Sequence, residues 1–241
     1  MRVDVLGVGF DDIAIGQAVL RACEILAENE KTYVVTPNPE IVSMARKDEA
    51  LSLAVNNAGL VLPDGIGIIL GARMLGTPLT GGRVPGIDFA SSLLSEMAQS
   101  SRSVFLLGAK QGIAEQAGEN LKEKFPGLVI AGSEDGYFTE DKPVIEKINS
   151  AQPDVLFVCL GSPRQELWMA EHIGHLQVKL CVGLGGSLDV FAGRVKRAHA
   201  FFRKLGIEWL YRLISDPRRI KRMIKLPLFV LAVMRKRLSG K

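Results

Sequence analysis

Short apolar runs alternate with amphipathic stretches along the first 190 or so residues of the chain. Most of the runs lack polar alternation, which is typical of strands that are covered on both faces. They predict seven strands, at residues 3–8, 32–36, 59–63, 103–108, 128–132, 154–161 and 178–185. Helical patterns lie between them, for example at 40–55 and 112–125. This alternation predicts an α/β fold with a mainly parallel, Rossmann-like sheet flanked by helices.

From about residue 195 the pattern becomes helical, aromatic and basic, so we divide the chain into an α/β core at 1–194 and a helical C-terminal appendage at 195–241. Residues 194–241 carry 15 Lys and Arg against two acids, whereas the preceding 193 residues hold 15 bases and 24 acids. Such a split indicates two functional regions, and the basic one needs an anionic partner. Nucleic acid, anionic lipid and a phosphorylated substrate all qualify.

The last apolar stretch, Leu226–Met234, is about half the ~20 residues that a membrane-spanning helix needs, and basic clusters flank it. This arrangement fits a segment that lies in the membrane interface, with apolar side chains in the headgroup boundary and cations on anionic lipid. The side chains expected to enter the boundary are Leu226, Leu228, Phe229, Leu231 and Val233.

Composition places the chain among folded proteins, with 47% hydrophobic and 23% charged residues. The N-terminus begins as a strand and meets acids at once, unlike a secretory signal. Three isolated cysteines in apolar runs (Cys23, Cys159 and Cys181) are expected to be buried and reduced. We therefore expect a cytoplasmic protein, held peripherally on the inner face of the plasma membrane by its basic appendage.

Polar residues follow several predicted strands, and ligands of open α/β sheets bind outside the carboxyl ends of the strands. The predicted strand at 32–36 is followed by Pro37-Asn38-Pro39. Asn38 can cap the next helix, and Pro39 suits the first position of that helix. A rigid cap explains this pattern by itself. Thr36 and Asn38 would, however, also face a ligand beside a helix N-terminus suited to anions.

Two further loops carry charged candidates. Asp64 lies in a Pro-Asp-Gly turn after 59–63, where its side chain either bonds nearby backbone or faces a substrate as a carboxylate. The glycine-rich loop 80–86 contains Arg83, which could reach an anion.

The last two strand ends have their own patterns. After 154–161, Ser162, Pro163 and Gln165 form the pattern of a capping box, which also sets Gln165 at the positive end of a helix. After 178–185, glycines at 183, 185 and 186 allow a ligand close to the backbone, and Asp189 could accept hydrogen bonds from a base or a sugar. Four such strand ends together predict one ligand site.

Several common motifs are absent from the sequence. Asp12 stands where G-x-G-x-x-G needs its third glycine, and there is no Walker motif, no G-x-S-x-G elbow and no Asp-x-Asp metal clamp. His172, His175 and His199 form no zinc motif. We therefore expect no metal and no cofactor.

The ordered motifs TPNPEIV, LPDGIGI, GGRVPG, LGSPRQE, GGSLDVFAG, RAHAFFRKLGIEWLYRL and DPRR resemble the TagA/WecG/CpsF glycosyltransferase family over essentially the whole chain, most closely its TagA-like members. The resemblance implies an inverting transfer of N-acetylmannosamine from its UDP donor to the 4-hydroxyl of N-acetylglucosamine on undecaprenyl diphosphate, which forms the β-1,4 linkage unit of wall teichoic acid. WecG-like members would instead transfer the uronic acid in another polysaccharide pathway.

The resemblance also implies roles for individual residues. Asp64 is similar to the family's proposed general base, and Thr36, Asn38 and Gln165 match substrate-pocket positions; Asp189 resembles a nucleoside-binding position. The appendage would complete the active site and attach the enzyme to the membrane. Three arginines of the appendage match family positions that are thought to hold the diphosphate; they are Arg212, Arg219 and Arg222. They would share one helix face if Pro217 did not interrupt the helix, and a solvated or lipid-facing basic stripe is the alternative.

Two other classes of function compete. A nucleic-acid-binding module would use the basic region to track phosphates, but it leaves the polar strand ends unexplained. A non-catalytic sensor of nucleotide sugars would bind UDP without needing Asp64. We rank both below the transferase and expect no nucleic-acid partner. Apolar residues at 205–214 could bury against the core, lipid or a second copy of the chain in a homo-oligomer.

Overall fold

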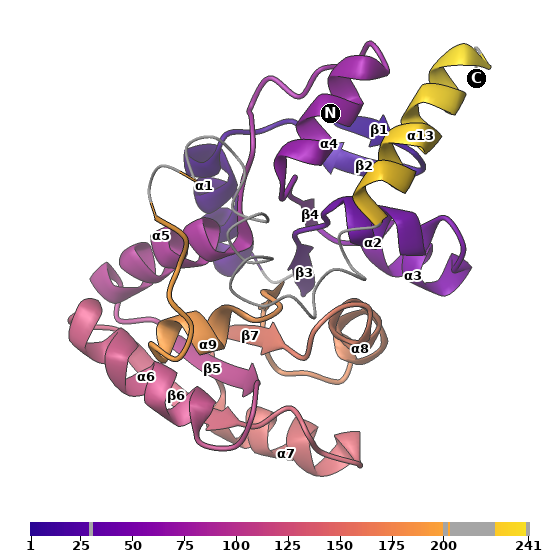
Figure 1. Ribbon diagram of the computed structural model, residues 1–241. Coiled ribbons are helices and arrows are strands. Elements are labelled where there is room, and N and C mark those ends of the chain that lie inside the picture. Colours follow the sequence, from indigo (N-terminus) through magenta and orange to yellow (C-terminus); the bar gives the residue numbers. More distant parts are fainter. Residues whose placement is uncertain (29–30, 200–201, 203–224, 240–241) are drawn as a thin grey trace.

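A computed structural model describes residues 1–28, 31–199, 202 and 225–239 of the chain. Its centre is a parallel six-stranded sheet with the order β4-β3-β8-β7-β5-β6. The strands are β3 (Thr32–Val35), β4 (Leu60–Val61), β5 (Ser103–Gly108), β6 (Val129–Glu134), β7 (Val155–Cys159) and β8 (Leu180–Gly183). The predicted α/β fold with a parallel sheet flanked by helices is confirmed (Figure 1).

Helices cover both faces of the sheet. One core contains residues of α2 (Pro39–Ala45), α3 (Glu49–Asn56), α4 (Ile66–Met74), α7 (Asp141–Ala151) and α8 (Arg164–His172), and the other contains residues of α1 (Ile15–Ala27), α5 (Gly86–Gln99), α6 (Ile113–Lys124) and α9 (Ser187–Phe191). Successive strand residues enter opposite cores. In β5, Phe105 and Leu107 join the first core, while Val104 and Leu106 join the second. Burial on both sides explains why these strands are apolar without alternation.

The prediction of one strand at residues 3–8 is wrong. This segment belongs to an antiparallel hairpin outside the main sheet, formed by β1 (Arg2–Val5) and β2 (Val8–Asp11). Leu6 and Gly7 form its two-residue turn with φ values of 58° and 92°. Positive φ at both central residues matches the twist of a tight hairpin, so the chain reverses inside the apolar run.

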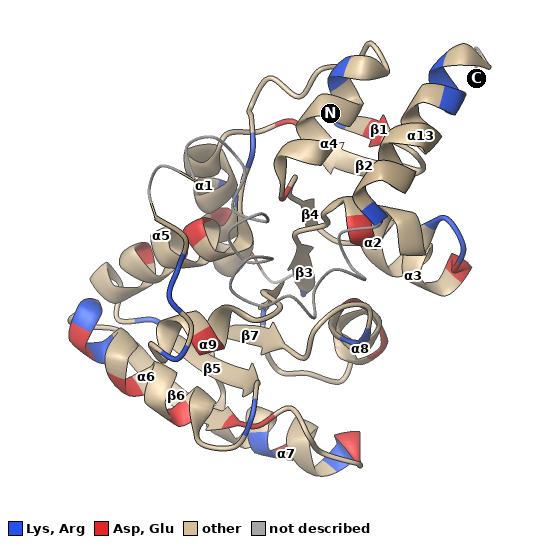
Figure 2. Cartoon of the chain, in the orientation of Figure 1, with Lys and Arg blue, Asp and Glu red and all other residues tan. Residues whose placement is uncertain are grey.

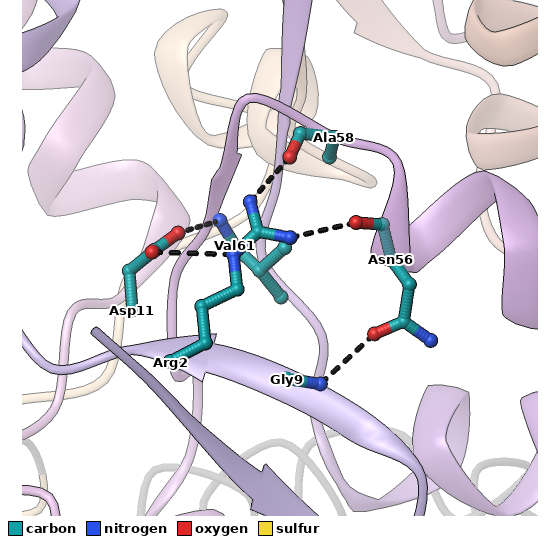
Figure 3. A network of polar contacts seen from close by, with 6 residues as sticks. All are labelled: Arg2, Gly9, Asp11, Asn56, Ala58 and Val61. Carbon is teal, nitrogen blue, oxygen red and sulfur yellow. Dashed lines mark hydrogen bonds and ion pairs between the residues drawn. The ribbon is translucent and has the colours of Figure 1, made fainter.

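Polar contacts attach this hairpin to the end of α3 and to the edge strand β4 (Figure 3). The guanidinium group of Arg2 donates to the carbonyl oxygens of Asn56 and Ala58 at 2.6 and 2.5 Å, and it pairs with Asp11 at 3.2 Å. Asp11 in turn accepts a hydrogen bond from the backbone N–H of Val61 at 2.8 Å. The network therefore satisfies a backbone donor of the edge strand and holds the strand that leads into the Pro-Asp-Gly turn.

The helix predicted at 40–55 is two helices, α2 and α3. Asp48 ends the connection between them, because its Oδ1 accepts a hydrogen bond from the backbone N–H of Leu51 at 3.1 Å and so caps α3. The helix predicted at 112–125 is confirmed as α6.

The described helix of the appendage, α13 (Lys225–Leu238), packs on α2 and α4 (Figure 1). Phe229 and Val233 are 1% and 0% exposed and belong to the core. A Cβ at Gly71 of α4 would lie 3.0 Å from the Phe229 ring, so this glycine admits the ring. The expectation that Phe229 and Val233 enter a membrane is wrong, because the core encloses them. Among the described residues no helix is long and apolar enough to cross a membrane.

Candidate active site

The four strands that precede the main predicted site residues are neighbours in the sheet. Because the order β4-β3-β8-β7 is parallel throughout, the carboxyl ends of these strands lie side by side. Thr36 and Asn38 follow β3, and the other residues follow β4, β7 and β8 or lie on the loop between α4 and α5. We call the set the strand-end site; its members are Thr36, Asn38, Asp64, Arg83, Gln165 and Asp189.

Thr36 and Asn38 occupy the loop after β3 as predicted. Thr36 is 9% exposed, and its hydroxyl donates to the carbonyl oxygen of Gly183 at the end of β8, at 3.4 Å. Oδ1 of Asn38 accepts hydrogen bonds from two backbone N–H groups of the first turn of α2, at 2.9 and 3.1 Å. The predicted cap, with Pro39 at the first helical position, is confirmed. The cap engages Oδ1, which leaves the amide Nδ2 as a donor for a ligand.

Asp64 is half-buried in the turn after β4. Its backbone N–H donates to the carbonyl oxygen of Pro37 at 3.2 Å, which ties this turn to the loop after β3. A Cβ at Gly67 would lie only 2.7 Å from Cγ of Pro39, so the glycine allows the two turns to pack closely. The result is a carboxylate held at the same edge of the sheet as the Asn38 cap.

The glycine-rich loop 80–86 is anchored by Asp12. The two carboxylate oxygens of Asp12 accept hydrogen bonds from the backbone N–H of Gly81 and the hydroxyl of Thr80, both at 2.7 Å. The bond from Gly81 is the main reason that the pKa of Asp12 lies below its ordinary value. In the sequence, Asp12 was noted only because it departs from a dinucleotide-binding motif. Its partner Gly81 is 69 residues away, and no sequence pattern predicts this contact.

The same loop also contacts the turn that holds Asp64. The backbone N–H of Val84 donates to the carbonyl oxygen of Pro63 at 2.9 Å. At the end of the loop, a Cβ at Gly86 would lie 2.9 Å from Oγ1 of Thr36. Arg83 is half-buried and directly precedes Val84, the first of these two anchors. The loop therefore brings a cation to the edge where Thr36 and Asp64 lie.

Gln165 contacts the loop after β8, and the predicted capping box is wrong. The helix α8 begins at Arg164, and the residue before it makes no side-chain cap. Ser162 donates instead to Glu166 at 2.9 Å, and Oε1 of Gln165 accepts a hydrogen bond from the backbone N–H of Gly185 at 2.8 Å. A capping box needs Ser162 as the residue directly before the helix. The helix starts two residues after Ser162, so the sequence has the spacing of a capping box but the structure does not form one.

Asp189 lies half-buried in α9, four residues after the glycine that Gln165 holds. Its backbone carbonyl accepts hydrogen bonds from the N–H groups of Arg194 and Val195 at 2.9 and 3.0 Å, which ends the helix. The loop after β8 thus links Gln165 to the helix that carries Asp189, a contact that the sequence analysis did not predict.

The arginines predicted to hold the diphosphate, Arg212, Arg219 and Arg222, lie outside the described residues. Within the described ranges, no three His, Cys, Asp or Glu side chains gather as a set that could hold a metal ion. The structure therefore bears on the core part of the site alone.

Glu166 is a second side chain, besides Asp12, whose role the sequence analysis missed. It lies inside the quoted motif LGSPRQE, yet it had no role there. In the structure it is 0% exposed, and burial raises its pKa above the ordinary value of a glutamate. An acid on the first turn of a helix normally faces solvent, so the sequence does not distinguish this buried glutamate from an ordinary exposed one.

Comparison of the sequence with known proteins identifies its family. The family model of the glycosyl transferase WecG/TagA/CpsF family matches residues 3–241. An N-acetylglucosaminyldiphosphoundecaprenol N-acetyl-beta-D-mannosaminyltransferase of Bacillus spizizenii is 39% identical over 210 residues, which cover 87% of this chain and 81% of the relative. The enzyme of the same name in Staphylococcus aureus (strain MRSA252) is 38% identical over 232 residues, or 95% and 91% of the two chains. The chain belongs to the WecG/TagA/CpsF family of glycosyltransferases.

Proposed function

We propose that this chain transfers N-acetylmannosamine from its UDP donor to the 4-hydroxyl of N-acetylglucosamine on undecaprenyl diphosphate, which forms the β-1,4 linkage unit of wall teichoic acid. The names of the two relatives support the acceptor and the sugar. The observation that carries the proposal is the adjacency of β4, β3, β8 and β7, which gathers a carboxylate, a threonine and two amides at one edge of a parallel sheet.

Each residue then has a chemical task. The Asp64 carboxylate takes the proton of the acceptor hydroxyl while that oxygen forms a bond to the anomeric carbon. The bond from the anomeric carbon to UDP breaks on the opposite side, and UDP leaves with the electron pair. Nδ2 of Asn38 and the amide of Gln165 orient the sugars, and Asp189 accepts hydrogen bonds from the nucleoside.

The leaving diphosphate needs positive charge. Arg83 from the core and the three appendage arginines supply it, because a planar guanidinium matches two phosphate oxygens at once. This assignment needs no metal, since the arginines stabilise the departing UDP themselves.

The activity is tested by following UDP release from UDP-N-acetylmannosamine with and without lipid-linked N-acetylglucosamine diphosphate, in EDTA. Release that depends on the acceptor is expected. Release only after addition of a divalent cation would contradict the metal-free assignment. Release from the uronic acid donor alone would assign a WecG-like substrate, and UDP binding without release from either donor would indicate a sensor.

The membrane-facing side of the protein is proposed to include α13. Its inner side is buried, but Leu228 and Leu231 are 57% and 56% exposed, and Met234 and Leu238 are also exposed. These residues recur at helical spacing on the outer side of α13. Apolar residues and nearby cations together favour attachment to an anionic lipid surface near the acceptor. The enzyme would then work peripherally on the cytoplasmic leaflet.

The core contributes to the same surface. A groove of about 1050 Å³ beside α13 is lined by Leu228 and Leu231, by Arg235, and by Arg46 and Lys47 from the connection between α2 and α3. Figure 2 shows basic residues on the last turns of α13 and on that connection. Cations from the core and the appendage therefore border one partly apolar surface.

Replacing Arg46 and Lys47 by glutamate is expected to weaken membrane binding. Each cation near an anionic bilayer adds ~1 kcal/mol, so loss of the two cations alone lowers partitioning by on the order of 30-fold, and the two added carboxylates lower it further. Sedimentation of the full chain with phosphatidylglycerol vesicles measures this change. The matched control is Lys122→Glu with Lys142→Glu, two exposed lysines on α6 and α7. Equal losses in the two double variants would show that net charge alone attracts the protein.

A further inference from the structure

Glu166 is a fully buried carboxyl group in the first turn of α8, next to Gln165 of the strand-end site. Burial of an acid costs free energy unless hydrogen bonds compensate it. Here desolvation raises the pKa of Glu166, while its hydrogen bonds to Gln165 and Ser162 act in the opposite direction. The proposed mechanism gives this carboxyl group no task.

The contacts of Glu166 converge on one of its oxygens. Oε1 accepts a hydrogen bond from Nε2 of Gln165 at 2.8 Å and another from Oγ of Ser162 at 2.9 Å. Oε2 is buried, and none of the described residues donates a hydrogen bond to it. The carboxyl group therefore works as an acceptor through Oε1, a task that a neutral amide oxygen could also perform.

The Glu166 bond fixes the second end of the Gln165 amide. Oε1 of Gln165 accepts a hydrogen bond from the backbone N–H of Gly185, and Gln165 is 2% exposed. A Cβ at Gly183 would lie 3.0 Å from Nε2 of Gln165, so the amide lies directly over β8. The carbonyl of the same Gly183 accepts the hydroxyl of Thr36. The amide is therefore held at both ends, beside another member of the site.

We propose that Glu166 is a positioning residue of the transfer reaction, which acts by holding the Gln165 amide with Oε1 toward Gly185 and Nε2 as the donor. The second N–H of Nε2 is then available to a substrate in one orientation only. This inference rests on the proposed function, since it assumes that Gln165 binds a substrate. Ordering the amide before the substrate arrives removes an entropic cost from binding and transfer.

A double-mutant cycle separates positioning from a general contribution to folding. Glu166→Leu removes the acceptor at similar size, and Gln165→Met removes the amide that it holds. In the otherwise unchanged protein, Glu166→Leu is expected to lower kcat/KM by about 10- to 100-fold, because the amide loses its buried acceptor. In the Gln165→Met background, the same change is expected to have less than about a threefold effect.

Two further variants test the acceptor itself. Glu166→Gln keeps an oxygen that can accept both hydrogen bonds, so its kcat/KM is expected to stay within about threefold of the unchanged protein. Ser162→Ala is the matched control, because it removes the other donor to Oε1 and leaves the Gln165 bond intact. A small loss, within about fivefold, is expected from it. These two variants keep the test valid even where Glu166→Leu fails to fold.

Several outcomes would overturn the proposal. Equal losses from Glu166→Leu in both backgrounds would assign Glu166 to the fold alone. A loss in Glu166→Gln as large as that in Glu166→Leu would show that a carboxylate is required, and a Ser162→Ala loss of that size would move the role to Ser162.

The orientation of the amide has a readout that does not need turnover. Nuclear magnetic resonance of the Gln165 side-chain amide, assigned by its absence in Gln165→Met, should show slow hydrogen exchange in the unchanged protein and in Glu166→Gln. Faster exchange is expected in Glu166→Leu, and unchanged exchange there would refute the positioning role. If the unchanged protein showed no transfer, the proposed function would fail, while the exchange measurement would still decide whether Glu166 holds the amide.

Discussion

Asp64→Asn is expected to lower kcat by ~10²- to 10⁴-fold and to leave the protein folded. The substitution keeps the size of the side chain but removes the oxygen that can take the acceptor proton. The backbone of this turn stays in place, since the N–H of residue 64 still donates to Pro37 and the neighbouring loop is still tied to Pro63. Acceptor-dependent UDP release at saturating substrates measures the loss.

A chemically identical substitution elsewhere provides the control. Asp48→Asn removes a carboxylate that caps α3, and asparagine caps helices about as well as aspartate. Its kcat should equal that of the unchanged protein. If Asp64→Asn turned over within about threefold of normal while it bound UDP, the carboxylate would have no role as a base, and the sensor hypothesis would gain support.

The sequence indicated the class of fold because a strand that is buried on both faces carries apolar residues at successive positions. Residues such as Val104 and Phe105 enter opposite cores, so β5 had to be apolar throughout. The polar residues after the strands were visible for the same reason, as breaks in apolar runs. What the sequence did not contain was the order of strands. The adjacency of β4, β3, β8 and β7 depends on where each connecting segment returns the chain to the sheet. The length of a connecting segment does not reveal that position.

Other features depended on contacts distant in sequence. The turn at Leu6 and Gly7 is hidden in an apolar run, and the hairpin is secured by Arg2 on carbonyls 54 and 56 residues away. The spacing of Ser162 and Gln165 is that of a capping box, but the amide oxygen of Gln165 accepts a hydrogen bond from the backbone N–H of Gly185 instead. In α13, apolar residues lie on both the inner and the outer side of the helix, and the sequence of α13 does not tell the two sides apart. Phe229 is buried where Gly71 of α4 leaves room for its ring.

Ending the chain after Arg194 is expected to abolish transfer, a larger loss than any single substitution in the core. The truncation removes all three appendage arginines, so the proposed diphosphate site would keep only Arg83. Removal of one preorganised donor that stabilises charge in the transition state commonly costs ~10²–10³ in kcat, and the truncation removes several proposed donors. Single-turnover UDP release, together with a thermal unfolding curve, measures the two consequences separately.

The structure adds an expectation about the remaining core. Phe229 and Val233 are buried against α2 and α4, so their removal exposes apolar surface. Loss of one large buried apolar side chain costs roughly 1.5–3 kcal/mol. The truncated core should therefore unfold at a lower temperature but still cooperatively, because both sides of its sheet remain covered by helices. Loss of cooperative unfolding would show that the core cannot fold without residues 195–241.

A second truncation, after residue 224, separates chemistry from support. It keeps the arginines and removes only α13, whose Lys225 pairs with Glu40 at 2.9 Å in the first turn of α2 and whose Leu226 lies at Gly67 of α4. These two helices begin beside Asn38 and Asp64, so α13 braces both loops from outside. We expect partial transfer to a short-chain soluble acceptor and loss of transfer on vesicles. Full activity on vesicles would contradict both the brace and the membrane role, whereas loss on both acceptors would assign α13 to the active site itself.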